Sequence, residues 1–331
     1  MVSAERRNPG VLPPRQRVVR RALLGVDGGG TKTHAVILDM NLEVMGEGLS
    51  GPSNPLRVGI SNACAAIREA IDKACEAAKI RRSDIVAAEI GLAGARRREL
   101  RVRMRESLKT LGMGEVAVTS DADIALYGAT QGAPGLIVIA GTGSNCCGIN
   151  GRGKKACAGG WGPIAGDEGG GAWIARRALR AIAHATDGRG PATILTEVAC
   201  AYFHVSDPND LSTAIYAPTI TNERLAGFGR DVVAAAKAKD RIAREILAEG
   251  GRELGMAAVA VIRTLKLEGE EFPVGYVGGV FASAGELVLA CMREEIKEVA
   301  PNAYLEPPQF PPAIAAARMA HDHLNNVAVA V

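Results

Sequence analysis

Hydrophobic and polar positions repeat along the chain with two different periods, and this predicts an alternation of strands and helices. The first apolar run is followed by the loop "DGGGTKT" and then by the run Ala-Val-Ile-Leu within residues 34–40. Since no helix follows this loop, we expect a hairpin of two strands over 23–40. The pattern then predicts a strand at 43–48, a helix at 60–79, a strand at 85–94, a helix at 96–112, a strand at 115–121 and a helix at 122–132.

The same pattern restarts in the second half of the chain. Residues 135–160 again read as strand, glycine-rich loop, strand, tight turn and strand. Beyond a helical stretch at 168–268 come a strand at 273–283, a helix at 284–299, a strand near Ala303 and an alanine-rich helix from 313. Two related α/β halves with facing glycine hairpins indicate a ligand between them, because ligand sites favour such interfaces.

Composition narrows the classes of protein that fit. The chain has 331 residues, 47% of them hydrophobic and only 4% aromatic, so it can bury a large core but offers little stacking surface for nucleic acid. No run approaches the about 18 apolar residues of a membrane span. Residues 1–21 contain six arginines and one acid, whereas the rest has 33 basic and 35 acidic side chains. We therefore expect a globular body with neither nucleic acid nor membrane as partner, and a disordered head at 1–20.

Seven cysteines occur without the spacing of a disulfide framework. The head lacks the apolar stretch of a signal peptide, which favours a cytoplasmic protein. We accordingly expect all seven to be reduced thiols. Cys146, Cys147 and Cys157 cluster in the sequence and could ligate a metal, but we expect them to be buried as small apolar residues.

The two glycine hairpins are candidate phosphate loops. The first is neither a P-loop, because Thr31 stands where the lysine belongs, nor a dinucleotide fingerprint, because Thr33 replaces the third glycine. Phosphates bind where backbone N–H groups converge, and glycine permits that close approach. The loops at 28–33 and 141–144 both offer this, and Asp27 at the end of the first strand could hold Mg²⁺ through water.

Three further stretches combine glycine with polar groups. "VTSDAD" places Asp121 and Asp123 between a strand and a helix, where either acid could be a helix cap or a general base. "GGWGPIAGDEGGGAW" presents Trp161, Asp167 and Glu168 ahead of a helix, which suits a polar ring-shaped ligand or a capped helix with a packed tryptophan. "YVGGVFAS" reads as a glycine turn after a strand, suited to a nucleotide's base or ribose.

Taken in order, "GVDGGGTKT", "TSDAD", "AGTGSNC", "GGWGPIAGDEGGGAW" and "VGGV" resemble motifs of the N-acetylglucosamine kinases. These belong to the BadF/BadG/BcrA/BcrD group of the actin/hexokinase-like ATPase superfamily. The resemblance implies an α/β fold of two RNase H-like domains with an inter-domain cleft and a helical insertion in the second. The domains would span 21–132 and 133–312, with the helix at 313–331 returning to the first.

The resemblance also implies roles for residues that match the motifs. The implied cofactors are ATP and Mg²⁺, the implied substrate is an amino sugar, and the protein is expected to form a homodimer. Asp121 would be the general base toward the sugar's 6-hydroxyl, and Asp27 would serve Mg²⁺. ATP and its phosphates would contact Gly28, Gly29, Gly30, Thr31, Lys32, Thr33, Gly141, Thr142, Gly278 and Gly279. The sugar would be held by Asn54, Ser144, Asn145, Trp161 and Asp167.

Departures from the family pattern leave alternatives open. The zinc-binding cysteine loop of a related repressor and kinase family is absent, which excludes that subgroup. Asn54 lacks the aromatic neighbour of some members, so N-acetylglucosamine, glucosamine and N-acetylmuramate all stay open as substrates. Two other functions fit the same group: an iron–sulfur ATPase that activates 2-hydroxyacyl-CoA dehydratases, and a sugar sensor without catalysis.

Overall fold

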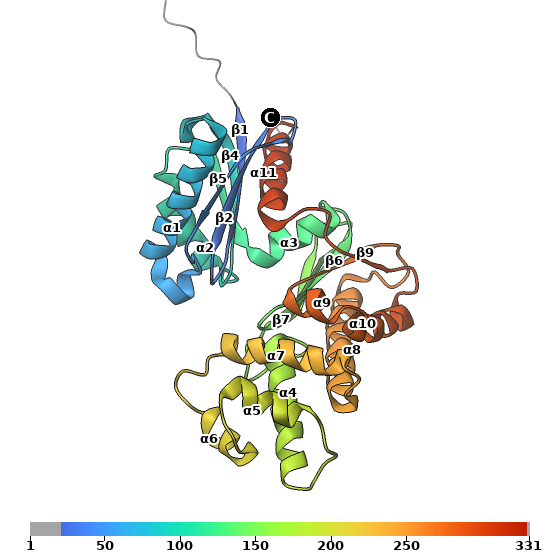
Figure 1. Ribbon diagram of the computed structural model, residues 1–331. Helices are drawn as coiled ribbons and strands as arrows, with labels where there is room; N and C mark the ends of the chain where they lie inside the picture. Colours follow the sequence, from blue (N-terminus) through green and yellow to red (C-terminus); the bar gives the residue numbers. More distant parts are fainter. Residues whose placement is uncertain (1–20, 330–331) are drawn as a thin grey trace, which may run out of the picture.

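The structure, a computed structural model, describes residues 21–329 and consists of two five-stranded sheets with helices around each (Figure 1). The arginine-rich head expected at 1–20 lies outside the described residues. Within residues 21–329, no helix is long and apolar enough to cross a membrane.

The N-terminal sheet has the strand order β3-β2-β1-β4-β5. β1 pairs antiparallel with β2 and parallel with β4, and β4 pairs parallel with β5. The carboxyl ends of β1, β4 and β5 therefore lie at the same edge of the sheet. Its strands alternate between two cores: Leu24 and Val26 face helix α1, whereas Leu23 faces helix α11. The elements are β1 (Ala22–Gly28), β2 (Thr33–Asp39), β3 (Val44–Ser50), α1 (Pro55–Ala78), β4 (Ile85–Leu92), α2 (Arg98–Lys109), β5 (Glu115–Ser120), α3 (Asp121–Thr130) and α11 (Pro312–Val329).

The C-terminal sheet repeats this arrangement with the order β10-β9-β6-β7-β8. Again the first strand pairs antiparallel with the second and parallel with the fourth. Its strands are β6 (Gly135–Ala140), β7 (Ser144–Ile149), β8 (Lys155–Gly159), β9 (Pro273–Val277) and β10 (Tyr304–Glu306). The predicted α/β fold with two repeated halves is thus confirmed.

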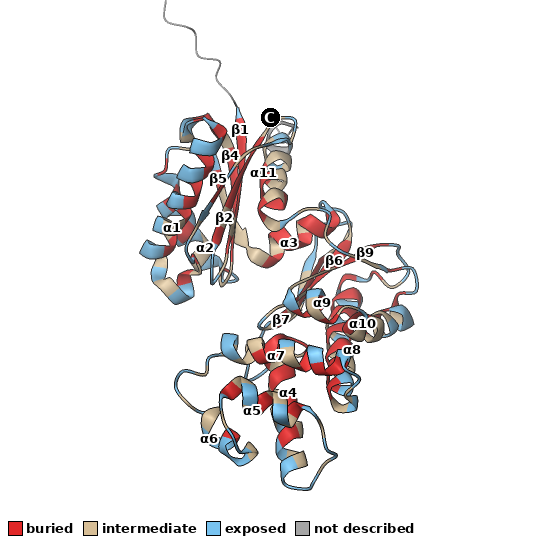
Figure 2. Cartoon of the chain, in the orientation of Figure 1, coloured by how far each residue is buried: buried red, intermediate tan, exposed pale blue. Residues whose placement is uncertain are grey.

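A set of helices is inserted between β8 and β9, as predicted. α4 to α7 gather beyond the C-terminal sheet, and α8 and α10 cover one of its faces (Figure 1). Their inward faces are buried and form the largest core of the molecule (Figure 2). The inserted helices are α4 (Gly171–Thr186), α5 (Leu195–Phe203), α6 (Leu211–Ala214), α7 (Asn222–Lys237) and α8 (Arg241–Leu265); α9 (Gly279–Ala284) and α10 (Glu286–Val299) follow β9.

Two boundaries differ from the sequence prediction. α1 begins at Pro55 rather than near Ile60, because Asn54 caps an extra first turn before the backbone breaks at Gly59, where φ is 78°. The stretch expected as a strand over 273–283 stops at Val277, and its remainder forms the short helix α9.

Helix α3 lies between the two halves (Figure 1). It follows β5 of the N-terminal sheet directly, yet Leu126 and Ala129 pack with Ile137 of the C-terminal sheet. The first turn of α3, which carries Asp121, is therefore held between the halves.

Candidate active site

The β1–β2 hairpin is anchored to the start of α1. Its turn is closed by the Gly29 amide, which donates to the Lys32 carbonyl over 2.9 Å. The Gly29 carbonyl in turn accepts from the amides of Ser53 and Asn54, over 3.0 and 3.1 Å. Gly30, Thr31 and Lys32 form the exposed tip of this turn.

Two hydroxyls that we expected to contact ligands are occupied by the protein itself. Thr33 is fully buried, and its Oγ1 lies 2.7 Å from both the Gly51 carbonyl and Ser53 Oγ. The Ser144 hydroxyl donates to the Glu168 carbonyl over 2.5 Å. The Thr33 side chain thus supports the hairpin instead of facing a phosphate, and Ser144 has its proton engaged in the loop ahead of α4.

The second hairpin rests on the amino end of α4. The carbonyls of Gly141 and Thr142 accept from the amides of Gly171 and Ala172 over 2.8 and 3.0 Å. A helix carries a partial positive charge at its amino end, which attracts anions. The hairpin and this helix end together form an environment suited to phosphate.

A cavity of about 350 Å³ brings the predicted nucleotide-binding elements together. Thr31 from the first hairpin lines it along with Gly141 and Thr142 from the second and Gly279 from α9. Gly278 stands just outside, with φ at 123°, and any side chain there would collide with the Ala140 carbonyl.

The same cavity has charged walls that sequence reasoning missed. Glu223 and Arg230 on α7 both line it. They lie in the helical insertion, far along the chain from either hairpin and outside any glycine motif, so no local signal marked them.

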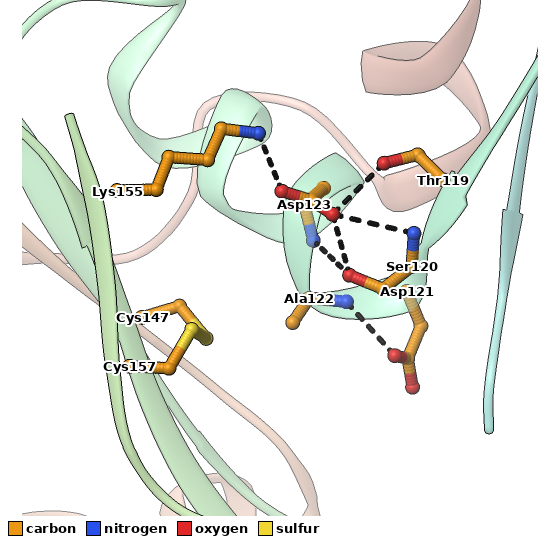
Figure 3. Close-up of a disulfide and its surroundings, with 8 residues drawn as sticks. All are labelled: Thr119, Ser120, Asp121, Ala122, Asp123, Cys147, Lys155 and Cys157. Atoms are coloured by element: carbon orange, nitrogen blue, oxygen red, sulfur yellow. Dashed lines mark hydrogen bonds and ion pairs between the residues drawn. A yellow bond between two sulfur atoms is a disulfide. The ribbon is translucent and has the colours of Figure 1, made fainter. Parts of the chain in front are cut away.

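The acids after β5 have separate tasks. Ser120 is the N-cap of α3 and accepts from the Asp123 amide, while Asp123 accepts from Thr119 and Ser120 and pairs with Lys155 over 2.5 Å. Asp121 points away from this cluster, and one of its oxygens accepts from the Ala122 amide over 2.9 Å (Figure 3). Because Ser120 and Asp123 already form the capping box, Asp121 is not needed to cap the helix.

Electrostatics couple Asp121 to the end of β1. Burial raises the pKa of Asp121, and it also raises the pKa of Asp27, which the negative charge of Asp121 raises further. Two buried carboxylates that repel each other favour a cation between or beside them. No group of three potential ligands occurs in the described chain, but Mg²⁺ typically takes one or two carboxylates together with phosphates and waters. The pair therefore fits Mg²⁺, which Asp27 would hold through water.

Two of the residues expected to bind the sugar, Asn54 and Asn145, have different surroundings. Asn54 caps α1 by accepting from Leu56 N over 3.0 Å, and its side chain lies against Gly94. Asn145 has a buried Oδ1 without a hydrogen-bond partner among the described residues. Buried polar atoms are normally satisfied, so an orphan acceptor indicates a donor supplied by something not present.

The loop before α4 was expected either to bind a polar ring-shaped ligand or to begin a capped helix with a packed tryptophan. Trp161 is 75% exposed, which rules out the packed tryptophan of a simple helix start. Asp167 has a φ of 61° and lies so close to Gly143 that a side chain there would collide with its carboxylate. This loop is therefore fixed to the second hairpin at Asp167 while presenting Trp161 outward.

The expectation of seven reduced cysteines is wrong for two of them. β7 and β8 pair in a register that places Cys147 opposite Cys157, with Cα atoms 4.1 Å apart, and the structure contains a disulfide between them (Figure 3). The spacing along the chain gave no sign of this, because a cross-strand pair depends on the register of the hairpin. The other five cysteines are free.

Comparison with known proteins agrees with this geometry. Residues 24–320 match the model of the BadF/BadG/BcrA/BcrD ATPase family. The chain belongs to this family. It is 35% identical over 259 residues to the N-acetylmuramic acid/N-acetylglucosamine kinase of Clostridium acetobutylicum, covering 78% of this chain and 85% of that one. It is 32% identical over 314 residues to the N-acetyl-D-glucosamine kinase of Dictyostelium discoideum, covering 91% and 98%.

Solved structures place this member of the BadF/BadG/BcrA/BcrD ATPase family in the same fold group. A structure from Chromobacterium violaceum, proposed there to be an N-acetylglucosamine kinase, superposes with a TM-score of 0.72 at 27% identity, covering 92% of this chain and 99% of that one. A ROK family glucokinase from Streptomyces griseus, in complex with glucose and AMPPNP, gives 0.55 at 19% identity, covering 91% and 99%. The actin/hexokinase-like fold expected from the motifs is thereby confirmed.

Proposed function

We propose that this protein transfers the γ-phosphoryl group of Mg·ATP to the 6-hydroxyl of an amino sugar, with N-acetylglucosamine as the substrate. The observation that carries the proposal is the position of Asp121. Its carboxylate takes no part in the capping box of α3, is buried enough for its pKa to rise, and lies near Asp27 at the edge that bears the first hairpin.

The reaction assigned to the site needs one proton acceptor and a rigid phosphate cradle. Asp121 takes the proton of the 6-hydroxyl as the sugar oxygen forms its bond to the γ-phosphorus and the bond to the β-phosphate oxygen breaks, which releases ADP. A base with a raised pKa accepts this proton more readily. The two hairpins and the amino end of α4 hold the phosphates, and Mg²⁺ beside Asp27 would offset their charge. Such phosphoryl transfer depends mainly on positioning and charge neutralisation.

The choice of sugar rests on the relatives. Two of them at 32% and 35% identity act on N-acetylglucosamine, one of them also on N-acetylmuramic acid. A third, at 29% identity, is a glucosamine kinase from Vibrio cholerae. Glucosamine and N-acetylmuramate are accordingly the alternative substrates. The proposal also includes a homodimer working in the cytoplasm.

A substrate screen tests the proposal. The full chain is incubated with ATP, Mg²⁺ and one sugar at a time, and ADP release is compared across N-acetylglucosamine, glucosamine, N-acetylmuramate and glucose. We expect N-acetylglucosamine to give the highest kcat/KM, and mass spectrometry to find the 6-phosphate. ADP release no faster than in the sugar-free control with every amino sugar would refute the kinase assignment.

A further inference from the structure

An ion pair connects the two halves of the protein at the mouth of the nucleotide cavity. The Arg57 guanidinium in the first turn of α1 pairs with the Glu223 carboxylate at the start of α7. Arg57 belongs to the N-terminal half, and Glu223 to the helical insertion 166 residues later. The pair therefore spans the cleft instead of stabilising one half.

The Arg57 guanidinium also lies over the tip of the first glycine hairpin. A Cβ placed on Gly30 would be 3.5 Å from Arg57 Nη1 and 3.8 Å from its Cζ. Thr31, the next residue of this tip, lines the cavity, as does Glu223 itself. Arg57 thus stands between the hairpin that is proposed to bind phosphates and an acid on the opposite wall.

The pair is placed where a phosphate group can exchange with it. Both side chains are about half exposed, at 55% and 46%, and an exposed ion pair changes an equilibrium by about fivefold at most. A charge-assisted hydrogen bond to a phosphate is worth about tenfold to a hundredfold. Guanidinium presents two parallel donors that match phosphate as well as carboxylate. It is therefore favourable for the Arg57 guanidinium to leave the Glu223 carboxylate and bind a phosphate oxygen.

Electrostatics give Glu223 a role of its own. The hydrogen bond from Arg57 lowers the pKa of Glu223, so this acid is negatively charged at neutral pH. A charged carboxylate in the wall of the cavity repels the phosphates of ATP unless Arg57 neutralises it.

We propose that Arg57 is a positioning residue for the phosphates of ATP, and that Glu223 holds it in place across the cleft until the nucleotide binds. This inference rests on the proposed function for the identity of the nucleotide. On binding, the guanidinium moves from the carboxylate to a phosphate oxygen, and no covalent bond changes. The two partners thus act on ATP affinity in opposite directions.

Calorimetric titration of the full chain with Mg·ATP, and separately with adenosine, tests this. We expect Arg57→Gln to weaken ATP binding at least about tenfold and to leave adenosine binding unchanged, because adenosine has no phosphate. Glu223→Gln should tighten ATP binding by up to about fivefold, since it frees Arg57 and removes a negative charge. Arg57→Lys, which keeps the charge without the fork, should fall between wild type and Arg57→Gln.

Arg224→Gln is the matched control, because it removes one positive charge from the exposed first turn of α7, next to Glu223, without affecting the hairpin. A pair that only ties the halves together predicts that Arg57→Gln and Glu223→Gln shift ATP affinity in the same direction, and this result would overturn the proposal. So would equal losses for Arg57→Gln and Arg224→Gln.

The outcome is separable from that of the kinase assignment. If ATP affinity responds to the variants as expected but no sugar is phosphorylated, the inference about Arg57 stands and the proposed function falls. If sugar is phosphorylated and Arg57→Gln binds ATP as tightly as wild type, the proposed function stands and the inference about Arg57 falls. A wild-type protein that binds no Mg·ATP overturns both.

Discussion

Asparagine at position 121 separates catalysis from helix capping in a single variant. Asp121→Asn keeps the size of the side chain and an oxygen that can accept from the Ala122 amide, a bond of 2.9 Å in the wild type. It could also still form the hydrogen bond to a sugar hydroxyl that the proposed mechanism requires. What it loses is the ability to take up the hydroxyl proton.

The expected magnitude follows from the two roles. A positioned general base typically contributes about 10²–10⁴-fold to the rate. We therefore expect kcat to fall at least roughly a hundredfold, with sugar affinity changed much less. The fold should not suffer, because the capping box of Ser120 and Asp123 is untouched. As a comparison, Ser120→Ala removes the cap itself and should cost about 1 kcal/mol of stability.

The pH dependence has a definite sign. Burial raises the pKa of Asp121 above 3.8. A raised carboxyl pKa means that stability is lost as the pH rises through it, so the neutral asparagine should leave the melting temperature unchanged or higher at pH 7.5. The same group must be ionised to act as a base. Wild-type kcat/KM should thus fall as the pH drops through that pKa, and the variant should lack this limb.

The assay measures ADP release with N-acetylglucosamine and Mg·ATP, sugar binding by calorimetry, and melting by calorimetric scan. A stable Asp121→Asn protein with near-normal kcat would refute the assignment of Asp121 as base. If Asp121 served only to cap the helix, asparagine would cap about equally well, and both kcat and the melting temperature would stay near their wild-type values.

Three other features give predictions with separate readouts. Asp27→Asn should weaken the Mg²⁺ dependence of turnover and leave sugar affinity nearly intact. Its melting temperature should exceed that of wild type at neutral pH but not at acid pH, because burial and the charge of Asp121 raise the pKa of Asp27. His323→Ala should lower stability by about 1 kcal/mol or less below pH 6.5, and by less at pH 9. The hydrogen bond with buried Glu89 raises the pKa of His323, so the stability that this bond contributes is lost as the pH rises through the raised pKa. An equal loss at both pH values would contradict this. Alkylation of the denatured, unreduced protein should label five cysteines and all seven after reduction, because Cys147 and Cys157 are bonded; seven labels before reduction would show the pair to be open.

Much of the architecture could be predicted because its signals are local. Strand β1 is a run of buried residues that ends at a glycine, and helix α10, predicted at 284–299, has an apolar face and begins after Gly285. The repeat of glycine hairpins marked both sides of the nucleotide cavity, and Thr31 and Thr142 do line it together. At the start of α3, however, the sequence could not decide which residue caps the helix. "TSDAD" contains a serine and two acids that can all cap a helix, and only the geometry shows Ser120 and Asp123 doing so.

What the sequence could not reveal are contacts whose partners lie far apart along the chain. In the sequence, Arg57 falls ahead of the helix predicted at 60–79, and Glu223 is one acid within the helical stretch at 168–268. Their pairing exists only because the inserted helices fold back over the first hairpin. The bond between Tyr127 and Asp322, and that between His323 and Glu89, arise in the same way when α11 returns to the N-terminal sheet. Such long-range pairs join α1 to α7 and α11 to α3 and β4. Motifs alone therefore identify the glycine hairpins, but they miss side chains such as Arg57 and Glu223 that distant parts of the chain bring beside them.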